Sequence, residues 1–177
     1  DGKICEGIKV GEIDIGGMTA EEAARAVESY TSGKAGQVIE VDVNGKTVAT
    51  TVGEVGYSFS TGDFMDQAMA VGRDGGMVSN YKAIKEAAQG KISYPIETQL
   101  DEKALKKFVK KKCKEQCTKV KNAEVKMEGG NFVYTKSRDG VTLDVDETCQ
   151  LIRKAVEEFQ GEGTIQVTAN VKVERPK

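Results

Sequence analysis

Residues 43–48 read Val43-Asn-Gly-Lys-Thr-Val48, and residues 55–64 read Val55-Gly-Tyr-Ser-Phe-Ser-Thr-Gly-Asp-Phe64. Two later stretches match them: Met127-Glu-Gly-Gly-Asn-Phe132 and Asp139-Gly-Val-Thr-Leu-Asp-Val-Asp-Glu-Thr148. Gly45 thereby aligns with Gly129 and Gly56 with Gly140, both 84 residues apart. Asn-Gly between two alternating runs is a strong signal for a two-residue β-hairpin. The chain is therefore predicted to contain one supersecondary unit twice.

A predicted helix precedes each hairpin, and another follows each short strand. The leading helices align at Thr19 and Leu100, 81 residues apart, so the second unit carries three extra residues before its hairpin. All four helices begin with residues that accept backbone N–H groups at a helix start: Thr19 with Glu22, Ser60 with Asp63, Asp101, and Asp144 with Glu147. Each unit is thus expected to run helix, hairpin, short strand, helix.

Further elements are expected around these two units. Residues 7–15 are predicted to form one strand whose alternation slips at Gly11, as a bulge would cause. The helix from Thr19 is expected to span about ten residues and to end at Ser32-Gly-Lys-Ala-Gly36. A polar helix is predicted over 79–89, an edge strand over 92–96 and one long strand over 165–173.

In the predicted strands apolar and polar residues alternate, so one face of each sheet should be exposed to solvent. This pattern favours an α+β fold with mainly antiparallel sheets over a parallel doubly wound sheet. The predicted division is a first repeat unit at 1–77, a connecting helix and strand at 78–99, and a second repeat unit at 100–177. At 177 residues the whole is expected to form one elongated domain.

Composition narrows the classes of function. The net charge of −2 disfavours nucleic acid as a partner. The chain contains no histidine, which removes Ser-His-Asp and Cys-His pairs and the usual nitrogen ligand of zinc. We therefore expect no catalytic residues, no metal and no cofactor. No stretch approaches the ~20 apolar residues that span a bilayer, so membrane attachment is expected only through an anchor outside this chain.

Lysines concentrate between residues 103 and 121. Nine of them fall there, at positions 103, 106, 107, 110, 111, 112, 114, 119 and 121. The simplest interpretation is the solvated face of one helix. The alternative is a patch that binds an anionic polymer, with Lys107 and Lys111 as candidate contacts.

The four cysteines permit disulfides in an oxidising compartment. Cys113 and Cys117 continue the apolar line of Leu105 and Val109 along one helix, and Cys149 lies on the apolar face of another. Two interpretations stay open: all four are small buried hydrophobes, or Cys113 or Cys117 is bridged to Cys149. The pair Cys117 and Cys149 is the candidate disulfide.

Scattered tyrosines are the candidate saccharide contacts, because aromatic rings can stack on sugars. Tyr57, Tyr81 and Tyr94 are the candidates, with Tyr134 as a further possibility, and the ligand is expected to lie along a groove between helix and sheet. Gly16-Gly17-Met18-Thr19 precedes a helix but lacks the lysine and spacing of a nucleotide loop, so it is expected to be a turn and a cap.

The ordered set of motifs resembles a known family. Gly7-Ile-Lys-Val-Gly-Glu-Ile-Asp-Ile-Gly-Gly-Met-Thr-Ala-Glu-Glu-Ala23 is similar to the opening of the peptidoglycan-binding domains found upstream of L,D-transpeptidase catalytic domains and in VanW-type envelope proteins. Later matches are Val52-Gly-Glu-Val-Gly-Tyr57, Ala70-Val-Gly-Arg-Asp-Gly75, and Asn122-Ala-Glu-Val125 running to Gly140-Val-Thr-Leu-Asp144. The chain lacks the Ser-His-Gly-Cys-like motif of the transpeptidases themselves.

The resemblance implies a non-catalytic, extracellular module of a Gram-positive cell envelope, anchored by an N-terminal transmembrane segment outside this sequence. It would bind peptidoglycan or an anionic wall polymer as a monomer and position a downstream domain. The alternative is a structural spacer or protein-interaction domain without affinity for glycan. A third class, an enzyme, would require a deep polar cleft with carboxylates of shifted pKa.

Overall fold

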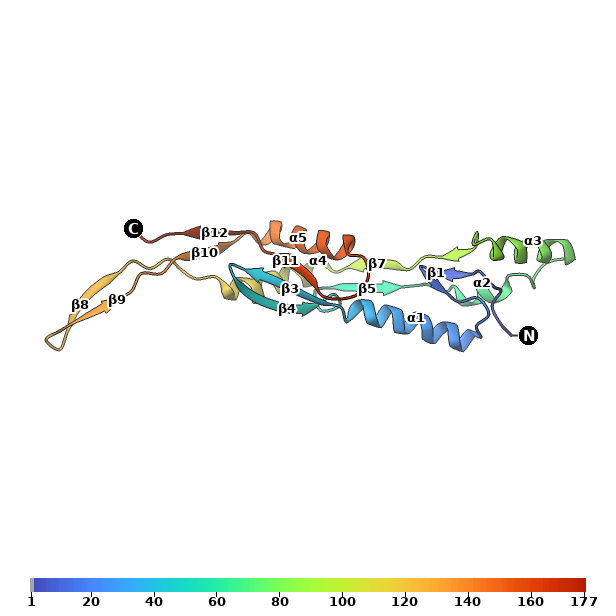
Figure 1. The fold of residues 1–177 in the computed structure, drawn as a ribbon, viewed down its shortest axis with the longest axis horizontal. Coiled ribbons are helices and arrows are strands. Elements are labelled where there is room, and N and C mark those ends of the chain that lie inside the picture. Colours follow the sequence, from blue (N-terminus) through green and yellow to red (C-terminus); the bar gives the residue numbers. More distant parts are fainter. Residues whose placement is uncertain (1) are drawn as a thin grey trace. The chain divides into compact units, whose positions relative to one another are not determined.

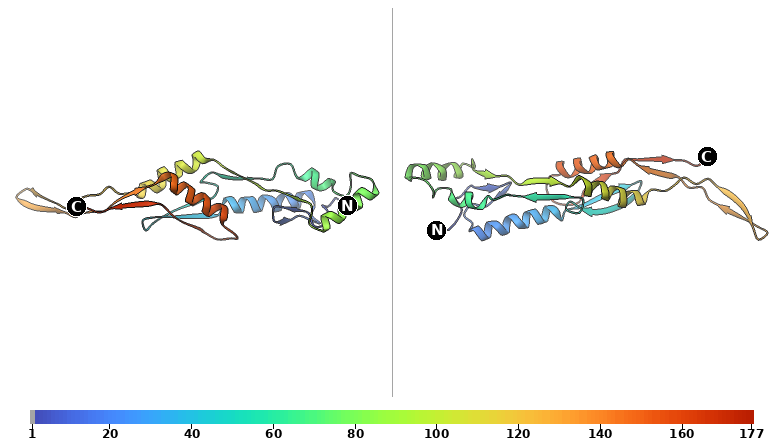
Figure 2. Two further views of the ribbon diagram at one scale, coloured as in Figure 1. Left: turned by 90° about the horizontal axis from the view of Figure 1, so that it is seen from above. Right: turned by 180° about the vertical axis from the view of Figure 1, so that it is seen from behind.

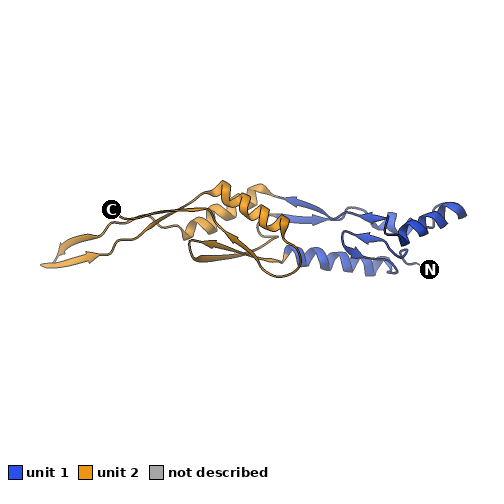
Figure 3. Ribbon diagram, turned by 45° about the horizontal axis from the view of Figure 1, so that its top comes forward, with its two compact units in different colours: residues 1–35, 57–100 blue, residues 36–56, 101–177 orange. Residues whose placement is uncertain are grey.

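The chain crosses three times between two compact units. In the computed structural model, which describes residues 2–177, unit 1 comprises residues 1–35 and 57–100, and unit 2 comprises residues 36–56 and 101–177 (Figure 3). These units reflect packing rather than sequence similarity. The predicted division at 1–77, 78–99 and 100–177, which rests on the repeat, stays a prediction.

Unit 1 contains three helices and two small sheets (Figure 1). Strand β1 pairs antiparallel with β2 and parallel with β6, and β5 pairs antiparallel with β7. Its elements are β1 (Lys9–Val10), β2 (Ile13–Asp14), α1 (Ala20–Ala35), β5 (Tyr57–Ser60), α2 (Met65–Ala70), α3 (Met77–Ala88), β6 (Ser93–Tyr94) and β7 (Glu97–Leu100).

One apolar cluster holds these elements of unit 1 together. Its members come from the β1–β2 hairpin and all three helices, and they include Ile8, Val10, Ile15, Ala23, Val27, Phe64, Ala68 and Ala87. Burying one branched aliphatic side chain stabilises the folded state by about 1.5–3 kcal/mol. The short strands are therefore stabilised mainly by the helices packed on them.

Unit 2 is built around a three-stranded sheet in the order β11-β3-β4. Its elements are β3 (Val38–Val43), β4 (Lys46–Thr51), α4 (Glu102–Phe108), a π-helix (Val109–Cys113), a 3-10 helix (Lys114–Gln116), β8 (Glu124–Glu128), β9 (Asn131–Thr135), β10 (Gly140–Leu143), α5 (Val145–Glu158), β11 (Ile165–Thr168) and β12 (Val171–Glu174). Ile39, Val41 and Val43 are fully buried on β3, as is Ile152 on α5. This sheet and its helices supply the core of unit 2.

The remaining strands of unit 2 form two antiparallel pairs, β10 with β12 and β8 with β9. The prediction of an α+β fold with mainly antiparallel sheets is confirmed; β1 with β6 and β11 with β3 are parallel pairs. The order helix, hairpin, strand, helix also occurs twice along the chain, at α1-β3-β4-β5-α2 and at α4-β8-β9-β10-α5. That the two arose by duplication stays a prediction.

Three of the predicted helix caps are present. Thr19 and Glu22 form a reciprocal capping box, with Glu22 N donating to Thr19 Oγ1 at 3.2 Å and Thr19 N donating to Glu22 Oε2 at 3.1 Å. The carboxylate of Asp101 accepts from the N–H groups of Lys103 and Ala104 at the start of α4. The carboxylate of Asp144 accepts from Glu147 N at 3.0 Å at the start of α5.

The cap predicted at Ser60 and Asp63 is wrong. Ser60 Oγ instead accepts from Gly62 N at 3.3 Å, which closes a local turn. Helix α2 therefore begins later, at Met65, and Phe64 precedes it without a side-chain cap.

The predicted end of the first helix is also wrong. Helix α1 continues through Ser32 and Gly33 to Ala35. Lys34 Nζ lies 5.7 Å from the centroid of the Tyr30 ring, and Thr31 Oγ1 donates to Glu28 O at 3.1 Å. These contacts one turn apart stabilise the last turns that Gly33 would weaken.

Two strand predictions need correction. Residues 9–14 form a hairpin rather than a bulged strand, because Gly11 (φ 57°) turns the chain and donates to Tyr94 O at 2.7 Å. The strand predicted at 165–173 is two strands that pair with different partners, β3 and β10. The chain changes sheet at Asn170, whose N–H donates to the buried Thr148 Oγ1 at 3.2 Å.

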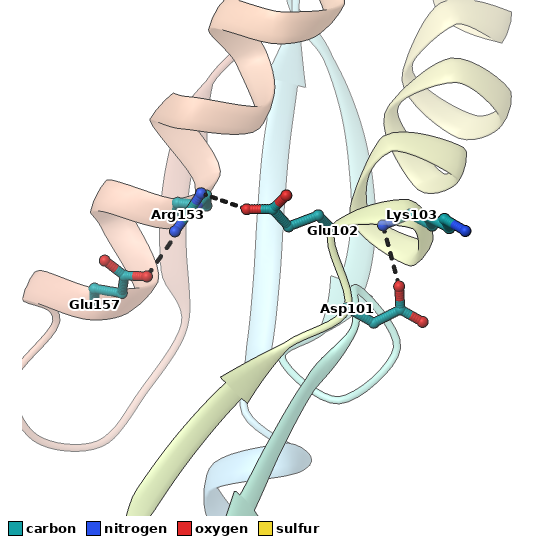
Figure 4. Close-up of polar contacts among 5 residues, drawn as sticks. All are labelled: Asp101, Glu102, Lys103, Arg153 and Glu157. Carbon is teal, nitrogen blue, oxygen red and sulfur yellow. Dashed lines mark hydrogen bonds and ion pairs between the residues drawn. The ribbon is translucent and has the colours of Figure 1, made fainter.

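An ion pair joins the two main helices of unit 2 next to the Asp101 cap. Arg153 Nη1 on α5 lies 3.1 Å from Glu102 Oε1 on α4, and Arg153 Nε lies 3.8 Å from Glu157 Oε1 (Figure 4). The arginine side chain is one-third exposed, so the pair contributes at most about 1 kcal/mol. It links α4 to α5 across 51 residues of sequence.

Candidate functional site

A groove of about 410 Å³ lies in unit 1 between α1 and the segment that leads from β5 to α2. Its volume falls within the range typical of small-molecule sites. The lining residues are Ala24, Val27, Glu28, Thr31, Phe59, Ser60, Thr61, Gly62 and Phe64.

Helix α1 provides one wall because its lining residues recur with helical spacing. Positions 24, 27, 28 and 31 follow the i, i+3, i+4, i+7 pattern and so share one face of the helix. Val27 is buried, whereas the Glu28 carboxylate is exposed. This wall therefore offers the apolar side chain of Val27 and the negative charge of the exposed Glu28 carboxylate.

The opposite wall begins on β5 and continues into the loop after it. Tyr57 and Phe59 alternate onto one face of β5; Tyr57 is buried, and Phe59 is partly exposed at the groove. The turn at Gly62 (φ 60°) brings Ser60 and Thr61 to the same wall. Phe64, which is 8% exposed, closes the groove and packs on Tyr94 with ring centroids 6.2 Å apart.

The groove suits a ligand that is hydroxyl-rich or carries an amine. Its polar lining consists of the Glu28 carboxylate and the hydroxyls of Thr31, Ser60 and Thr61, beside the apolar edge of Phe59. No lysine or arginine is among the lining residues found in the described part of the chain. An anionic ligand would therefore have no counter-charge there, whereas sugar hydroxyls or an ammonium group would find acceptors.

The candidate tyrosines do not line this groove. Tyr57 is only 4% exposed, so its ring is buried. Tyr94 is half-buried behind Phe64, and burial raises the pKa of its hydroxyl. Tyr81 is 70% exposed on α3. The groove residues themselves were missed by sequence reasoning, although the sequence predicts both the helix face of Val27 and the strand of Phe59.

The candidate lysines lie in unit 2 on a helical segment that changes from an α-helix to a π-helix. Lys107 is exposed on α4, and Lys111 is exposed on the π-helix over Val109–Cys113. Among the seven lysines of residues 103–114 within the described structure, only Lys106 forms an ion pair, with Asp146 at 3.8 Å. The other six are exposed and form no ion pair within 4 Å in this part of the structure, so positive charge predominates along this segment.

All four cysteines are free thiols in the structure, so the predicted Cys117–Cys149 bridge is not formed. The sequence pattern placed Cys117 on the same helix face as Cys113, but the helix ends before Cys117. The 3-10 helix ends at Gln116, and Cys117 is extended (ψ 144°). Cys113 is fully buried and packs as a small hydrophobe, in keeping with the first of the two interpretations.

The thiol of Cys113 should make the free energy of unfolding depend measurably on pH. Burial, followed by the neighbouring Cys149 and Cys117, raises the pKa of its thiol from 9.0 to about 11. Because the folded pKa is raised, the associated stability is complete below pH 9 and is lost as the pH rises toward 11. We expect wild type to lose about 2–3 kcal/mol more free energy of unfolding than Cys113→Ala over this range.

Denaturant titrations of both proteins at pH 8.5 and pH 11 measure this difference. A second measurement is alkylation at pH 8 followed by peptide mapping, in which Cys113 should react far more slowly in the native chain than in denaturant. Parallel pH curves for the two proteins, together with rapid native labelling of Cys113, would contradict the burial of this thiol.

Comparison with known proteins identifies the family of the chain. Residues 48–164 match the family model described as "Putative peptidoglycan binding domain". The match covers more than half of the chain, so the chain belongs to this family. It includes the β5 wall of the groove, whereas α1 precedes the matched segment.

No curated protein and no solved structure matches the chain significantly. Of the helices in residues 2–177, none has the length and hydropathy needed to cross a bilayer.

Proposed function

We propose that the chain is a non-catalytic, extracellular peptidoglycan-binding module of a Gram-positive envelope protein that positions a downstream domain. Family membership supports a cell-wall binding role. The observation that carries the proposal further is the groove between α1 and β5, which combines an aromatic edge with hydroxyl and carboxylate acceptors.

The chemistry of the groove indicates which part of peptidoglycan would enter it. A glycan strand presents hydroxyls and apolar ring faces, which suit the hydroxyl groups of Ser60 and Thr61 and the ring of Phe59. A stem peptide with a free side-chain amine would instead place its ammonium beside Glu28. Both ligands fit a site that contains one carboxylate and no cation in its lining.

The exposed lysines of residues 103–114 favour a second ligand, an anionic wall polymer bound through Lys107 and Lys111. Binding of this kind depends strongly on salt because it displaces counterions, whereas binding in the groove should depend on salt only weakly. The same assay therefore separates the two ligands. A structural spacer, the remaining alternative, would bind neither.

Retention on purified sacculi tests the groove. We expect Phe59→Leu to weaken binding about tenfold, because it removes the aromatic ring while keeping an apolar side chain in place. Glu28→Gln should weaken binding several-fold by replacing a charged acceptor with a neutral one. Dissociation constants from a sedimentation assay at moderate salt give both values.

Matched controls are available, one on the same helix and one in unit 2. Glu21→Gln changes an exposed carboxylate of α1 outside the groove, and Phe132→Leu changes an exposed aromatic residue of unit 2. Both should bind like the original chain. Equal binding by the Phe59 and Glu28 variants would exclude the groove as the site. Failure of the unaltered chain to bind sacculi above an unrelated protein would exclude peptidoglycan binding altogether.

A further inference from the structure

Two of the hairpins in this chain acquire a third strand in the same way. In unit 1, β6 pairs parallel with β1, the first strand of the β1–β2 hairpin. In unit 2, β11 pairs parallel with β3, the first strand of the β3–β4 hairpin. Each added strand comes from a later part of the chain, and each hairpin buries one face in its unit.

The third hairpin, β8–β9, lacks such a strand within residues 2–177. One of its faces is nevertheless apolar, because Val125 pairs with Tyr134 and Met127 pairs with Phe132. These four side chains are 58%, 74%, 66% and 62% exposed, in that order. Both views in Figure 2 show the hairpin extending away from the helices of unit 2. A two-stranded hairpin left in this state is only marginally stable in water.

The outer edge of β8 also has unused backbone groups. Glu128 and Asn131 close a two-residue turn at Gly129-Gly130, so residues 124, 126 and 128 exchange hydrogen bonds with β9. The N–H and C=O groups of Val125 and Met127 therefore point outward. The corresponding residue of β3 is Asp42, one position before the closing pair, and its C=O accepts from Ala169 N at 2.8 Å after β11.

We propose that the outer edge of β8 accepts a third, parallel strand, supplied by an extended polypeptide segment in which apolar and polar residues alternate. The pattern is that of Ile165-Gln-Val-Thr-Ala169, which completes the β3–β4 sheet. The added strand would bond to the free groups of Val125 and Met127 and extend the apolar face. The surface is thus an interface for a protein strand, separate from the glycan groove.

The position of Lys177 makes a direct test possible. Its backbone N–H donates to Asn122 Oδ1 at 3.0 Å, and Asn122 lies two residues before β8. A strand joined to Lys177 through a short Gly-Ser linker would start at the base of β8 and could run parallel to it. Tethering also raises the effective concentration of the strand to about the millimolar range.

The experiment compares the full chain with two extended forms. One form carries a copy of residues 164–174 after the linker, and the other carries the same copy with each Ile and Val replaced by Ser. We expect the first extension to slow hydrogen exchange at the amides of Val125 and Met127 at least tenfold, and the second to leave it unchanged. The amide of Lys126, which already faces β9, reports separately on the hairpin itself.

Three outcomes would overturn the proposal. Unchanged exchange at Val125 and Met127 in the first form would show that this edge takes no strand of this pattern. Equal protection by both extensions would show that alternation of apolar residues is irrelevant. Protection that appears only together with dimers, measured by sedimentation, would assign the surface to a second copy of the chain.

Discussion

The Gly7→Ala variant should lose about 3 kcal/mol or more of its free energy of unfolding. Gly7 has a φ of 85°, which disfavours side chains, and a Cβ there would lie 2.1 Å from the backbone oxygen of Ala87. That oxygen belongs to the end of α3 and cannot rotate away as a side chain would. The helix would have to move from the apolar cluster of unit 1. Urea denaturation followed by circular dichroism measures the loss.

Gly33→Ala is the matched control for this variant. Gly33 lies within α1, and nothing in the described structure lies within 4 Å of a Cβ built there. Because alanine favours the helix over glycine, this substitution should stabilise the protein by about 0.5–1 kcal/mol. A similar small effect from both substitutions would mean that α3 does not pack against Gly7.

Ile152→Ala should destabilise unit 2 by about 3–5 kcal/mol. Ile152 is fully buried on the inner face of α5, where that helix packs on the sheet. Removing three carbon atoms there leaves a cavity where α5 packs on α4 and β11, and a close-packed interior cannot refill it easily. Chemical denaturation of the variant gives the value directly.

The control is an isoleucine of similar chemistry in a different environment. Ile84 on α3 is 46% exposed, so Ile84→Ala should cost only about 1 kcal/mol. If Ile152→Ala cost no more stability than Ile84→Ala, this result would contradict the burial of Ile152 between α5 and the sheet.

Features decided within a few residues could be predicted from the sequence. The cap at Thr19 depends on Glu22 three residues later, and the hairpin turn depends on Asn44 and Gly45, both with positive φ. Errors arose where another local contact competed. Ser60 bonds to Gly62 instead of capping α2, and the contact of Lys34 with Tyr30 extends α1 past Gly33.

Pairings between distant segments could not be predicted. Alternation identifies Ile165 and Val167 as strand residues, but nothing local indicates that they pair with Ile39 and Val41. The change of sheet at Asn170 depends on Thr148, which lies 22 residues away. Local patterns specify the element, whereas its partner depends on the packing of the whole unit.

The candidate site was predictable only in its general form. A groove between helix and sheet was expected, but tyrosines were proposed as its contacts because their rings are the obvious aromatic surface. The structure buries Tyr57 and places Phe59 at the groove instead. Alternation puts both on one face of β5, and only the packing of α1 determines which of them reaches solvent.

The pairing of β3 with β11 has a consequence for the order in which the chain can fold. Gln166 Nε2 donates to Glu40 Oε2 at 2.8 Å across 126 residues of sequence. During synthesis, residues 36–56 must therefore wait until residues 165–168 have been made before their sheet is complete. Contacts of such long range fold slowly, and an unfinished strand edge is prone to aggregate. Unit 2 should consequently depend more than unit 1 on protection while the chain is being made.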